Sequence, residues 1–292
     1  MSESERWPRI AVLGPGLLGG SLALALKERG CGDEVVIWGR RRQAVDEALE
    51  LGVCDRASVD VGEVIDGADV VVLATPVPVM GEVFAQGADF LKPGCLVTDV
   101  GSVKARVVED LEKVVEVKGG VFIGGHPMAG SENSGIRHSR ADLFEGAACI
   151  LTPGDSVGDQ AVARARGFWE SVGCRVSLET AERHDALVAR ISHMPHAVAS
   201  AVVNVALGAD VGIADVAGAG FRDTTRVAGG DPGMWRGILE ENRAAVVPVL
   251  RELCDELGEL VRALEGGDGN AVSQFLDRAK KLRQGCSPRD LK

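Results

Sequence analysis

The chain has 292 residues, of which 46% are hydrophobic and 26% are charged, and its formal net charge is −11. This length allows two domains with separate cores, and the composition is that of an ordinary soluble globular protein. The acidic balance argues against a nucleic acid or an anionic membrane surface as the partner.

We expect neither a targeting signal nor a membrane span from this sequence. The first residues, MSESERWPRI, lack the basic segment and apolar run that a signal peptide requires. No apolar stretch approaches the roughly 18–20 residues of a membrane-spanning helix. The seven cysteines are single, without a CxxC pair, which is typical of reduced thiols in the cytoplasm and not of disulfides or a zinc site.

Strand and helix signals alternate through the first half of the chain. A β-rich run at residues 9–14 precedes a helical pattern at about 17–29, which Gly30 closes. Further apolar runs that predict strands follow at residues 34–39, 68–76, 94–102, 119–127, 147–153 and 174–179. Continuous Val, Ile and Leu runs that alternate with helices indicate a parallel sheet with both faces buried.

From residue 180 to about residue 283, almost every segment has a helical pattern, interrupted by glycine-rich turns. Because the strand signals stop here, we place a domain boundary near residues 172–180. The predicted organisation is a sheet domain at residues 1–175 and an all-helical, substrate-binding domain at residues 176–292.

Gly14, Gly16 and Gly19 form a G-x-G-x-x-G motif directly after the first predicted strand and at the start of the first helix. In this context the glycines allow a tight turn, close approach of the backbone to a pyrophosphate, and an anion site at a helix N-terminus. The alternative is a tight turn without a ligand. We therefore predict a Rossmann-type, doubly wound α/β domain that binds a dinucleotide.

The end of the second predicted strand bears on the choice of cofactor. A dinucleotide-binding fold normally has an Asp or Glu there, which binds the adenosine ribose and repels the additional phosphate of NADP. Here the strand ends in Gly39, and Arg40, Arg41 and Arg42 follow. Three cations are unfavourable at the start of a helix, and a bound phosphate would offset that cost.

We therefore predict that NADP is favoured over NAD. The alternative is that these arginines are solvated and the protein takes either cofactor, or NAD through backbone contacts. The predicted cofactor-binding residues are Gly14, Gly16, Leu17, Leu18, Gly19, Gly39, Arg40, Arg41, Thr75 and Pro76.

Four downstream motifs, together with the glycine motif, point to a family. They are DVGSVK (residues 99–104), HPMAGSE (126–132), SHMPH (192–196) and GFRDTTRVAGGDPGMW (220–235). With these motifs in this order, the chain resembles the prephenate/arogenate dehydrogenase family of tyrosine biosynthesis from about residue 9 to about residue 245. The resemblance implies oxidative decarboxylation. Hydride leaves the ring carbon that bears the hydroxyl and goes to the nicotinamide, while the ring carboxylate departs as CO2 and the ring becomes aromatic.

His126 is the predicted base of this reaction. The step needs a neutral base that holds the ring hydroxyl and takes its proton as hydride leaves, and histidine is suited to this near neutral pH. His126 follows a predicted strand, at the carboxyl edge where an α/β sheet binds its ligands. The Gly124–Gly125 pair lets backbone and substrate approach closely. The resemblance assigns His126 the same role, and the alternative is a histidine bonded to the backbone at a strand end.

Ser102 ends another predicted strand at this edge. The resemblance implies that it hydrogen-bonds the imidazole or the ring hydroxyl, and the alternative is an N-cap for a helix that starts near Val103. Lys104 lies in the first turn of that helix, where a lysine is usually solvated, so we leave it outside the site.

A second histidine group lies on the helix predicted to start near residue 180. Ser192 is four residues from His196 and His193 is three, so each pair shares a helix face. Pro195 frees backbone groups one turn earlier and kinks the helix there, which suits the wall of a pocket. The resemblance implies that His196 contacts the substrate, supported by Ser192 and His184. We expect His193 to be a bystander.

The substrate side chain carries a carboxylate that is retained, and such an anion is best bound by a planar bidentate cation. FRDTTRVA supplies Arg222 and Arg226, and the resemblance places the carboxylate-binding role on Arg226. The alternative is an ordinary exposed arginine. A second strong cation at the leaving carboxylate would oppose loss of CO2, so we expect one firm clamp. Asp223 and Glu132 are nearby charges whose roles the sequence leaves open.

Three functional alternatives stay open at this point. Arogenate has an amino group where prephenate has a keto group, and we take prephenate, which gives 4-hydroxyphenylpyruvate, as the lead. A β-hydroxyacid- or pyrroline-type NAD(P) oxidoreductase also joins a Rossmann domain to helices, but it leaves HPMAG and SHMPH unexplained. A dinucleotide-sensing protein without catalytic activity also fits the fold. No metal is predicted, because cysteine and carboxylate ligands at suitable spacing are missing.

The last long helical pattern predicts a homodimer formed through the helical domain. Its apolar residues follow a four–three alternation, the seam of paired helices, at Val246, Leu250, Leu253, Leu257, Leu260 and Leu264. Val247, Cys254 and Val261 lie on another side of the same helix, so two faces need cover. The alternative is that both faces are covered within the chain.

Overall fold

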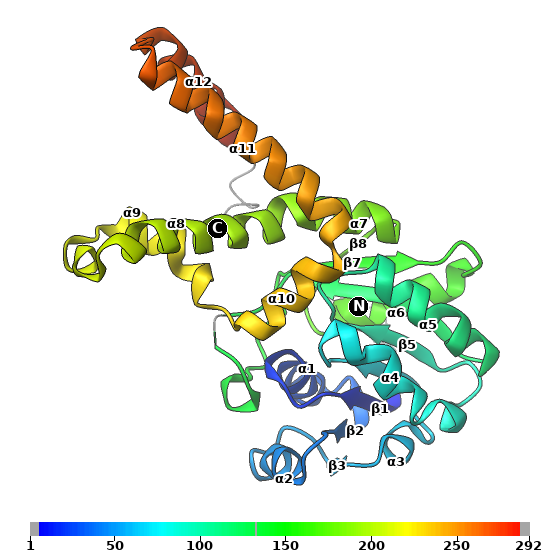
Figure 1. The fold of residues 1–292 in the computed structure, drawn as a ribbon. Coiled ribbons are helices and arrows are strands. Elements are labelled where there is room, and N and C mark those ends of the chain that lie inside the picture. Colours follow the sequence, from blue (N-terminus) through cyan, green and yellow to red (C-terminus); the bar gives the residue numbers. More distant parts are fainter. Residues whose placement is uncertain (1–5, 132, 287–292) are drawn as a thin grey trace. The chain divides into compact units, whose positions relative to one another are not determined.

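The computed structural model describes residues 6–131 and 133–286 (Figure 1). The chain divides into two compact units, Met1–Arg243 and Ala244–Lys292. The first unit contains an eight-stranded sheet in the order β3-β2-β1-β4-β5-β6-β7-β8. The strands are β1 Trp7–Leu13, β2 Gly32–Trp38, β3 Arg56–Ser58, β4 Val70–Leu73, β5 Leu96–Asp99, β6 Val121–Pro127, β7 Ala148–Pro153 and β8 Arg175–Leu178.

The strand order from β3 to β6 is that of a doubly wound dinucleotide-binding sheet, which confirms the predicted Rossmann-type fold. Two details differ from the prediction. The sequence does not predict β3, because its three residues contain a single apolar side chain. In addition, β7 is antiparallel to β6, whereas the other neighbouring strands are parallel. The described segment between β6 and β7 contains only a short 3₁₀ turn, Ile136–His138, in place of the helix of a parallel crossover.

Helices cover both faces of the sheet, and the alternation of β1 explains why. Ile10 and Val12 pack in one core with residues of α1 and α6, while Ala11 and Leu13 pack in the other core with residues of α3, α4 and α5. Both faces are therefore buried, as the continuous apolar strands predict. The helices are α1 Leu17–Glu28, α2 Arg42–Glu50, α3 Val61–Ile65, α4 Met80–Ala85, α5 Ala105–Val117 and α6 Asp159–Ser171.

The rest of the first unit is helical, as predicted. Between α7 and α8 the backbone forms a π-helical turn, Ala189–His193, directly before Pro195. Proline has no N–H to donate to the carbonyl one turn earlier, so the helix widens there. The sequence predicts a kink here, and the structure has a π-helical turn at this place. The helices are α7 Ala181–Val188, α8 Met194–Ala209, α9 Ala219–Thr225 and α10 Pro232–Glu241.

The stretch from α7 to α8 corrects one expectation. Residues Ala181–Ala209 form one helical run that is long and apolar enough, by length and composition, to cross a membrane. A core helix of a globular protein passes the same test, and this run carries the buried polar side chains His184, Asp185, His193 and His196. These side chains belong to the site described below.

The second unit, as far as residue 286, consists of two helices that lie side by side (Figure 1), α11 Arg243–Glu265 and α12 Gly269–Gly285. Asp268 begins α12, because its carboxylate accepts hydrogen bonds from the N–H groups of Asn270 (3.1 Å) and Ala271 (3.0 Å). Arg278 of α12 pairs with Glu256 of α11, so the two helices are joined by an ion pair as well as by a short turn.

Candidate active site

The glycine turn between β1 and α1 has the geometry of a dinucleotide site. Gly14 has a φ of +134°, and a Cβ there would lie 2.5 Å from the carbonyl oxygen of Ala74. A Cβ on Gly19 would lie 2.0 Å from the carbonyl oxygen of Gly14, so turn and helix pack without side chains between them. A Cβ on Gly16 would meet no atom within 4 Å. Gly16 also begins α1 without a side-chain cap, which leaves the N–H groups of this helix end available to an anion.

Other predicted cofactor residues surround this turn. Leu17 and Leu18 are half-buried in the first turn of α1, and Thr75 and Pro76 follow β4. A Cβ on Gly14 would lie 3.1 Å from the main-chain nitrogen of Thr75. The hydroxyl of Thr75 is buried and has no hydrogen-bond partner among the described residues. An unsatisfied buried hydroxyl beside the glycine turn fits a bound ligand at this place.

The residues after β2 are packed differently from one another. A Cβ on Gly39 would lie 3.0 Å from the proline ring of the glycine turn, so this position has little room for a side chain. Arg40 and Arg41 are exposed, and Arg41 is the N-cap residue of α2. Arg42 instead donates a hydrogen bond of 2.9 Å from Nε to Asp46. Arg40 and Arg41 therefore remain the candidates for binding a phosphate.

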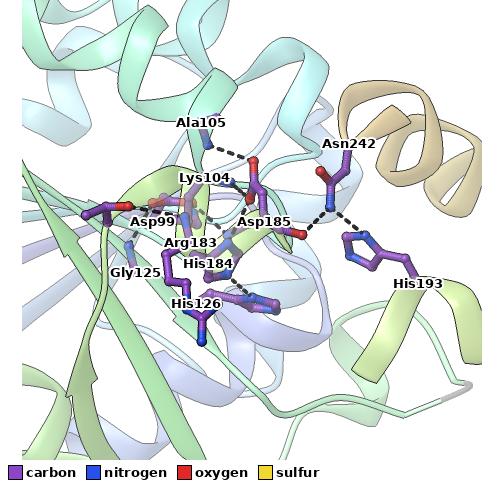
Figure 2. A network of polar contacts seen from close by, with 12 residues as sticks. Asp99, Lys104, Ala105, Gly125, His126, Arg183, His184, Asp185, His193 and Asn242 are labelled. Carbon is purple, nitrogen blue, oxygen red and sulfur yellow. Dashed lines mark hydrogen bonds and ion pairs between the residues drawn. The ribbon is translucent and has the colours of Figure 1, made fainter. Parts of the chain in front are cut away.

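His126, at the end of β6, starts a chain of buried hydrogen bonds (Figure 2). Its Nδ1 lies 2.7 Å from Nε2 of His184, and Nδ1 of His184 lies 2.7 Å from Oδ1 of Asp185. The carboxylate of Asp185 accepts hydrogen bonds from the main-chain N–H groups of Lys104 (2.7 Å) and Ala105 (3.0 Å). These groups form the N-terminus of α5, where unpaired donors and the helix dipole stabilise a carboxylate. Helix α5 therefore anchors the acidic end of the chain.

The order of donors and acceptors along this series of hydrogen bonds fixes the tautomer of each histidine. An ionised carboxylate only accepts hydrogen bonds, so Nδ1 of His184 carries a proton and donates it to Asp185. In neutral His184 the other nitrogen, Nε2, is then an acceptor, and Nδ1 of His126 must donate to it. His126 is left with a lone pair on Nε2, which is the form that a general base needs.

Burial keeps these imidazoles neutral. The pKa of His126 lies well below its ordinary value, first because the ring is buried and then through electrostatic interactions with His184, Lys104 and His193, which disfavour a further positive charge. Burial also lowers the pKa of His184, against the opposing effect of its hydrogen bond to Asp185. The site therefore holds His126 as a free base near neutral pH.

Lys104 corrects the sequence expectation, because its side chain is fully buried and pairs with the equally buried carboxylate of Asp99. Asp99 also accepts a hydrogen bond of 3.0 Å from the N–H of Gly125. A Cβ on Gly124 would lie 3.1 Å from Cδ of Lys104. The nearest atom to that Cβ would be Oγ1 of Thr152, at 2.4 Å, so a side chain on Gly124 would press on both residues. The carboxylate of Asp99 joins Lys104 to the strand that presents His126. Burial of this lysine requires a paired acid, because an unpaired buried charge is costly, and the sequence pattern does not show that Asp99 lies within reach.

Ser102 lies half-buried in the loop between β5 and α5. It does not cap α5, because that helix begins at Ala105 and Asp185 satisfies the first N–H groups. Its main-chain carbonyl favours the protonated form of His193, although Nε2 of His193 has no partner of normal hydrogen-bond geometry among the described residues. A role for the Ser102 hydroxyl towards His126 stays a prediction.

The second histidine group packs on Trp235, a residue that sequence reasoning missed. His196 stacks on the indole, with ring centres 3.5 Å apart and planes 9° apart, and His193 meets the indole edge at 6.3 Å. Nδ1 of His193 also lies 3.0 Å from Nδ2 of Asn242, and the expectation that His193 is a bystander towards the substrate stays a prediction. Ser192 is half-buried on the π-helical turn. Trp235 lies in the quoted motif GGDPGMW, which was the available signal, but an indole has no titratable group to draw attention.

The fully buried His184 has both ring nitrogens engaged, Nε2 with His126 and Nδ1 with Asp185, and its predicted supporting role at the substrate stays a prediction. Arg226, the predicted carboxylate clamp, is exposed at the junction of α9 and the following 3₁₀ turn. Arg222 is also exposed, and it donates a hydrogen bond of 2.8 Å to the carbonyl of Ala217. The clamp role of Arg226 stays a prediction. Asp223 is exposed on α9, and Glu132 lies outside the described residues.

Two family profiles match most of the chain. Residues 22–178 match the family described as prephenate dehydrogenase, nucleotide-binding domain. Residues 180–278 match the family described as prephenate dehydrogenase, dimerization domain. The first match spans most of the sheet, and the second spans the helices that follow it.

Individual proteins agree with these profiles. A cyclohexadienyl dehydrogenase of Zymomonas mobilis is 34% identical over 279 residues, which covers 94% of each chain. A prephenate dehydrogenase of Bacillus subtilis is 34% identical over 282 residues, covering 94% of this chain and 75% of the relative. The solved structure of a prephenate dehydrogenase from A. aeolicus, in complex with hydroxyphenyl propionate and NAD+, superposes with a TM-score of 0.87 at 32% identity, covering 95% of this chain and 97% of that one. This chain therefore belongs to the prephenate dehydrogenase family of oxidoreductases.

Proposed function

We propose that this chain catalyses the NAD(P)-dependent oxidative decarboxylation of prephenate to 4-hydroxyphenylpyruvate and CO2 in tyrosine biosynthesis. The observation that carries the proposal is the neutral His126, whose Nδ1 is tied to His184 and whose Nε2 is left as a base. His126 ends a strand at the same sheet edge as the glycine turn, since the strands from β1 to β6 are parallel. Base and cofactor site therefore share the edge where such sheets bind ligands.

The chain's own groups account for the proton movement in this reaction. Nε2 of His126 accepts the hydrogen bond of the ring hydroxyl and takes its proton as the hydrogen on the same carbon leaves as hydride. The bond to the ring carboxylate breaks, CO2 departs, and the electron pair of that bond completes the aromatic ring. The proton then returns to the phenolate oxygen, so no net proton is released. A bound nicotinamide supplies the hydride acceptor.

The residues behind His126 stabilise the protonated form that appears during the step. The imidazolium of His126 keeps its Nδ1 hydrogen bond to His184, and Asp185 lies at the end of the chain with a compensating negative charge. An acid behind a catalytic histidine has the same effect in Ser-His-Asp triads, where it orients the ring and stabilises the imidazolium without taking the proton.

Steady-state kinetics with prephenate and arogenate test the proposed substrate. We expect a higher kcat/KM with prephenate, followed by the absorbance of the reduced nicotinamide. Turnover of arogenate alone would identify arogenate as the substrate in place of prephenate, with the same oxidative decarboxylation. Absence of turnover with both substrates and both cofactors would contradict the proposed function.

NADP is the favoured cofactor in this proposal. The support is that exposed arginines follow β2, at the place where NAD-binding folds normally have an Asp or Glu. Arg40→Ala and Arg41→Ala should each lower kcat/KM for NADP by roughly tenfold or more, because a hydrogen-bonded charge is lost, and should leave the value for NAD nearly unchanged. Arg42→Ala is the matched control, because Arg42 already pairs with Asp46. Gly39→Asp is a poor test, since its Cβ would press on a proline ring. A wild type that prefers NAD would contradict this part.

Substrate binding is proposed for Arg226, His196 and Ser192. Arg226→Ala should raise KM for prephenate with a smaller effect on kcat, because a carboxylate clamp acts on ground state and transition state alike. Arg222→Ala is the matched control on the same helix, four residues earlier. An unchanged KM in Arg226→Ala would move the clamp elsewhere.

Self-association through the helical domain is supported by the apolar residues that the second unit leaves exposed. They lie on both helices and comprise Val247, Leu257, Val261, Leu264, Leu276 and Leu282. We propose a homodimer in which a second copy covers these side chains. Light scattering should give twice the monomer mass of 30.5 kDa, and a monomer at micromolar concentration would contradict the dimer.

The boundary between nucleotide-binding and substrate-binding parts is proposed at residues 175 and 176. It lies close to the end of β8 at Leu178.

Cytoplasmic location is proposed because the protein has five buried, free thiols, which are typical of a reducing compartment. The thiols are Cys31, Cys54, Cys95, Cys149 and Cys174.

A further inference from the structure

Asn242 is a buried polar residue that no motif singles out. It follows the last residue of α10, is 3% exposed, and its N–H donates to the carbonyl of Ile238. Its side-chain Nδ2 donates to the main-chain carbonyl of Asp185 at 2.9 Å and lies 3.0 Å from Nδ1 of His193 (Figure 2). One amide therefore joins two histidine-bearing segments, helix α7 and the π-helical turn.

The orientation of this amide follows from its partners. The carbonyl of Asp185 only accepts hydrogen bonds, so the nitrogen of the Asn242 amide, and not its oxygen, must face it. The same nitrogen faces Nδ1 of His193, which must then be the acceptor. His193 consequently carries its proton on Nε2. Burial also lowers the pKa of His193 to about 4, so the ring is neutral near pH 7.

Both contacts lead to the catalytic chain. The carbonyl that Asn242 holds belongs to Asp185, whose carboxylate orients His184 and, through it, His126. The main-chain carbonyl of Ser102, in the loop before α5, raises the pKa of His193 and so favours its protonated form. Helix α10, which ends directly before Asn242, carries Trp235 against His193, so the amide follows a helix that packs on the same histidine.

We propose that Asn242 is a positioning residue, which fixes His193 in the tautomer protonated on Nε2 and holds the Asp185 segment so that His126 keeps its lone pair on Nε2. The amide donates both of its hydrogens and takes no part in proton transfer. The kinetic consequence rests on the proposed function, whereas the tautomer of His193 does not.

The first test measures the tautomer without turnover. In a ¹⁵N-histidine-labelled protein, with the His193 signals identified from their loss in His193→Gln, we expect a protonated Nε2 and a bare Nδ1. Asn242→Asp replaces the donor by an acceptor of the same shape, so the proton should move to Nδ1 of His193. A wild type protonated on Nδ1, or a tautomer that is the same in Asn242→Asp, would overturn the proposal.

The second test separates positioning from a general loss of structure. Asn242→Ala should lower kcat roughly 10- to 100-fold, the range expected when catalytic groups are displaced slightly, with little change in KM for the cofactor. His193→Ala should lower kcat as well, and the double variant should lose little more than the larger single loss, because the two residues act in one path. Losses that multiply in the double variant would overturn the proposal, even if both variants melt at lower temperature. If the wild type does not oxidise prephenate, the proposed function fails while the tautomer result still decides the role of Asn242.

Discussion

The glycine turn and the histidine chain lie at the same edge of the sheet but are built in opposite ways. The turn uses backbone groups of one short segment, Gly14 to Gly19, and works because side chains are missing. The histidine chain uses side chains from two separate elements, β6 and α7, and His126 and His184 are 58 positions apart. The cofactor site is therefore encoded locally, whereas the base depends on tertiary contacts that set the position of each proton.

The largest expected effect is on the histidine side of this comparison. His126→Asn should lower kcat roughly 10²–10⁴-fold, the usual contribution of a general base, because an amide does not take a proton near neutral pH. Cofactor binding, measured by fluorescence titration, should be unchanged, since the glycine turn does not use this side chain. Turnover within a few-fold of wild type would show that His126 is not the base.

Asp185→Asn tests whether the negative charge of the carboxylate supports the base. Both carboxylate oxygens accept main-chain N–H groups, from Lys104 and Ala105, so an amide in either orientation turns its NH2 towards one of these donors. The charge that stabilises the imidazolium of His126 is lost in both orientations, and kcat should fall roughly 10²-fold or more, as in other histidine–acid pairs. An unchanged kcat would show that the charge of Asp185 does not support His126.

Gly14→Ala tests the other side of the comparison. At a φ of +134° and with a Cβ 2.5 Å from the carbonyl of Ala74, alanine must shift the turn, so KM for the cofactor should rise roughly tenfold. Gly16→Ala is the matched control, because its Cβ meets no protein atom. In Gly16→Ala only a bound cofactor could clash with the new methyl group. Protein stability should therefore fall in Gly14→Ala and not in Gly16→Ala.

The smallest expected effect is on stability against pH. The folded pKa of His126, His184, His193 and His196 is lowered, chiefly by burial, so below the ordinary value of 6.5 the unfolded chain binds protons that the folded chain does not. The free energy of unfolding should therefore fall as pH decreases from 7 to 5, with His193 contributing roughly 2 kcal/mol. Urea unfolding of His193→Gln should show a weaker pH dependence. His138→Gln, at an exposed position, should show the wild-type dependence.

The same contrast explains what the sequence predicts well. Strand and helix alternation and the glycine motif depend on local periodicity and spacing, so β1, α1 and the Rossmann-type order follow from the sequence. His126 is found because a glycine-flanked histidine after a strand is unusual. The roles of Lys104, Asp185 and Asn242 are not predicted. Lys104 is buried because it pairs with Asp99, and the other two residues bond to partners on other elements. The contacts that a side chain on Gly124 would make with Thr152 and Lys104 are likewise tertiary, and the sequence does not show them.

The central claim is that His126 is held as a neutral base, and the pH profile of kcat/KM for prephenate tests it most directly. The acidic limb of this profile reports the essential base of the free enzyme. Because the pKa of His126 is lowered well below 6.5, we expect kcat/KM to stay level as pH falls through 6.5 and to decline only at more acidic pH. An acidic limb with an apparent pKa at or above 6.5 in the wild type would contradict the account.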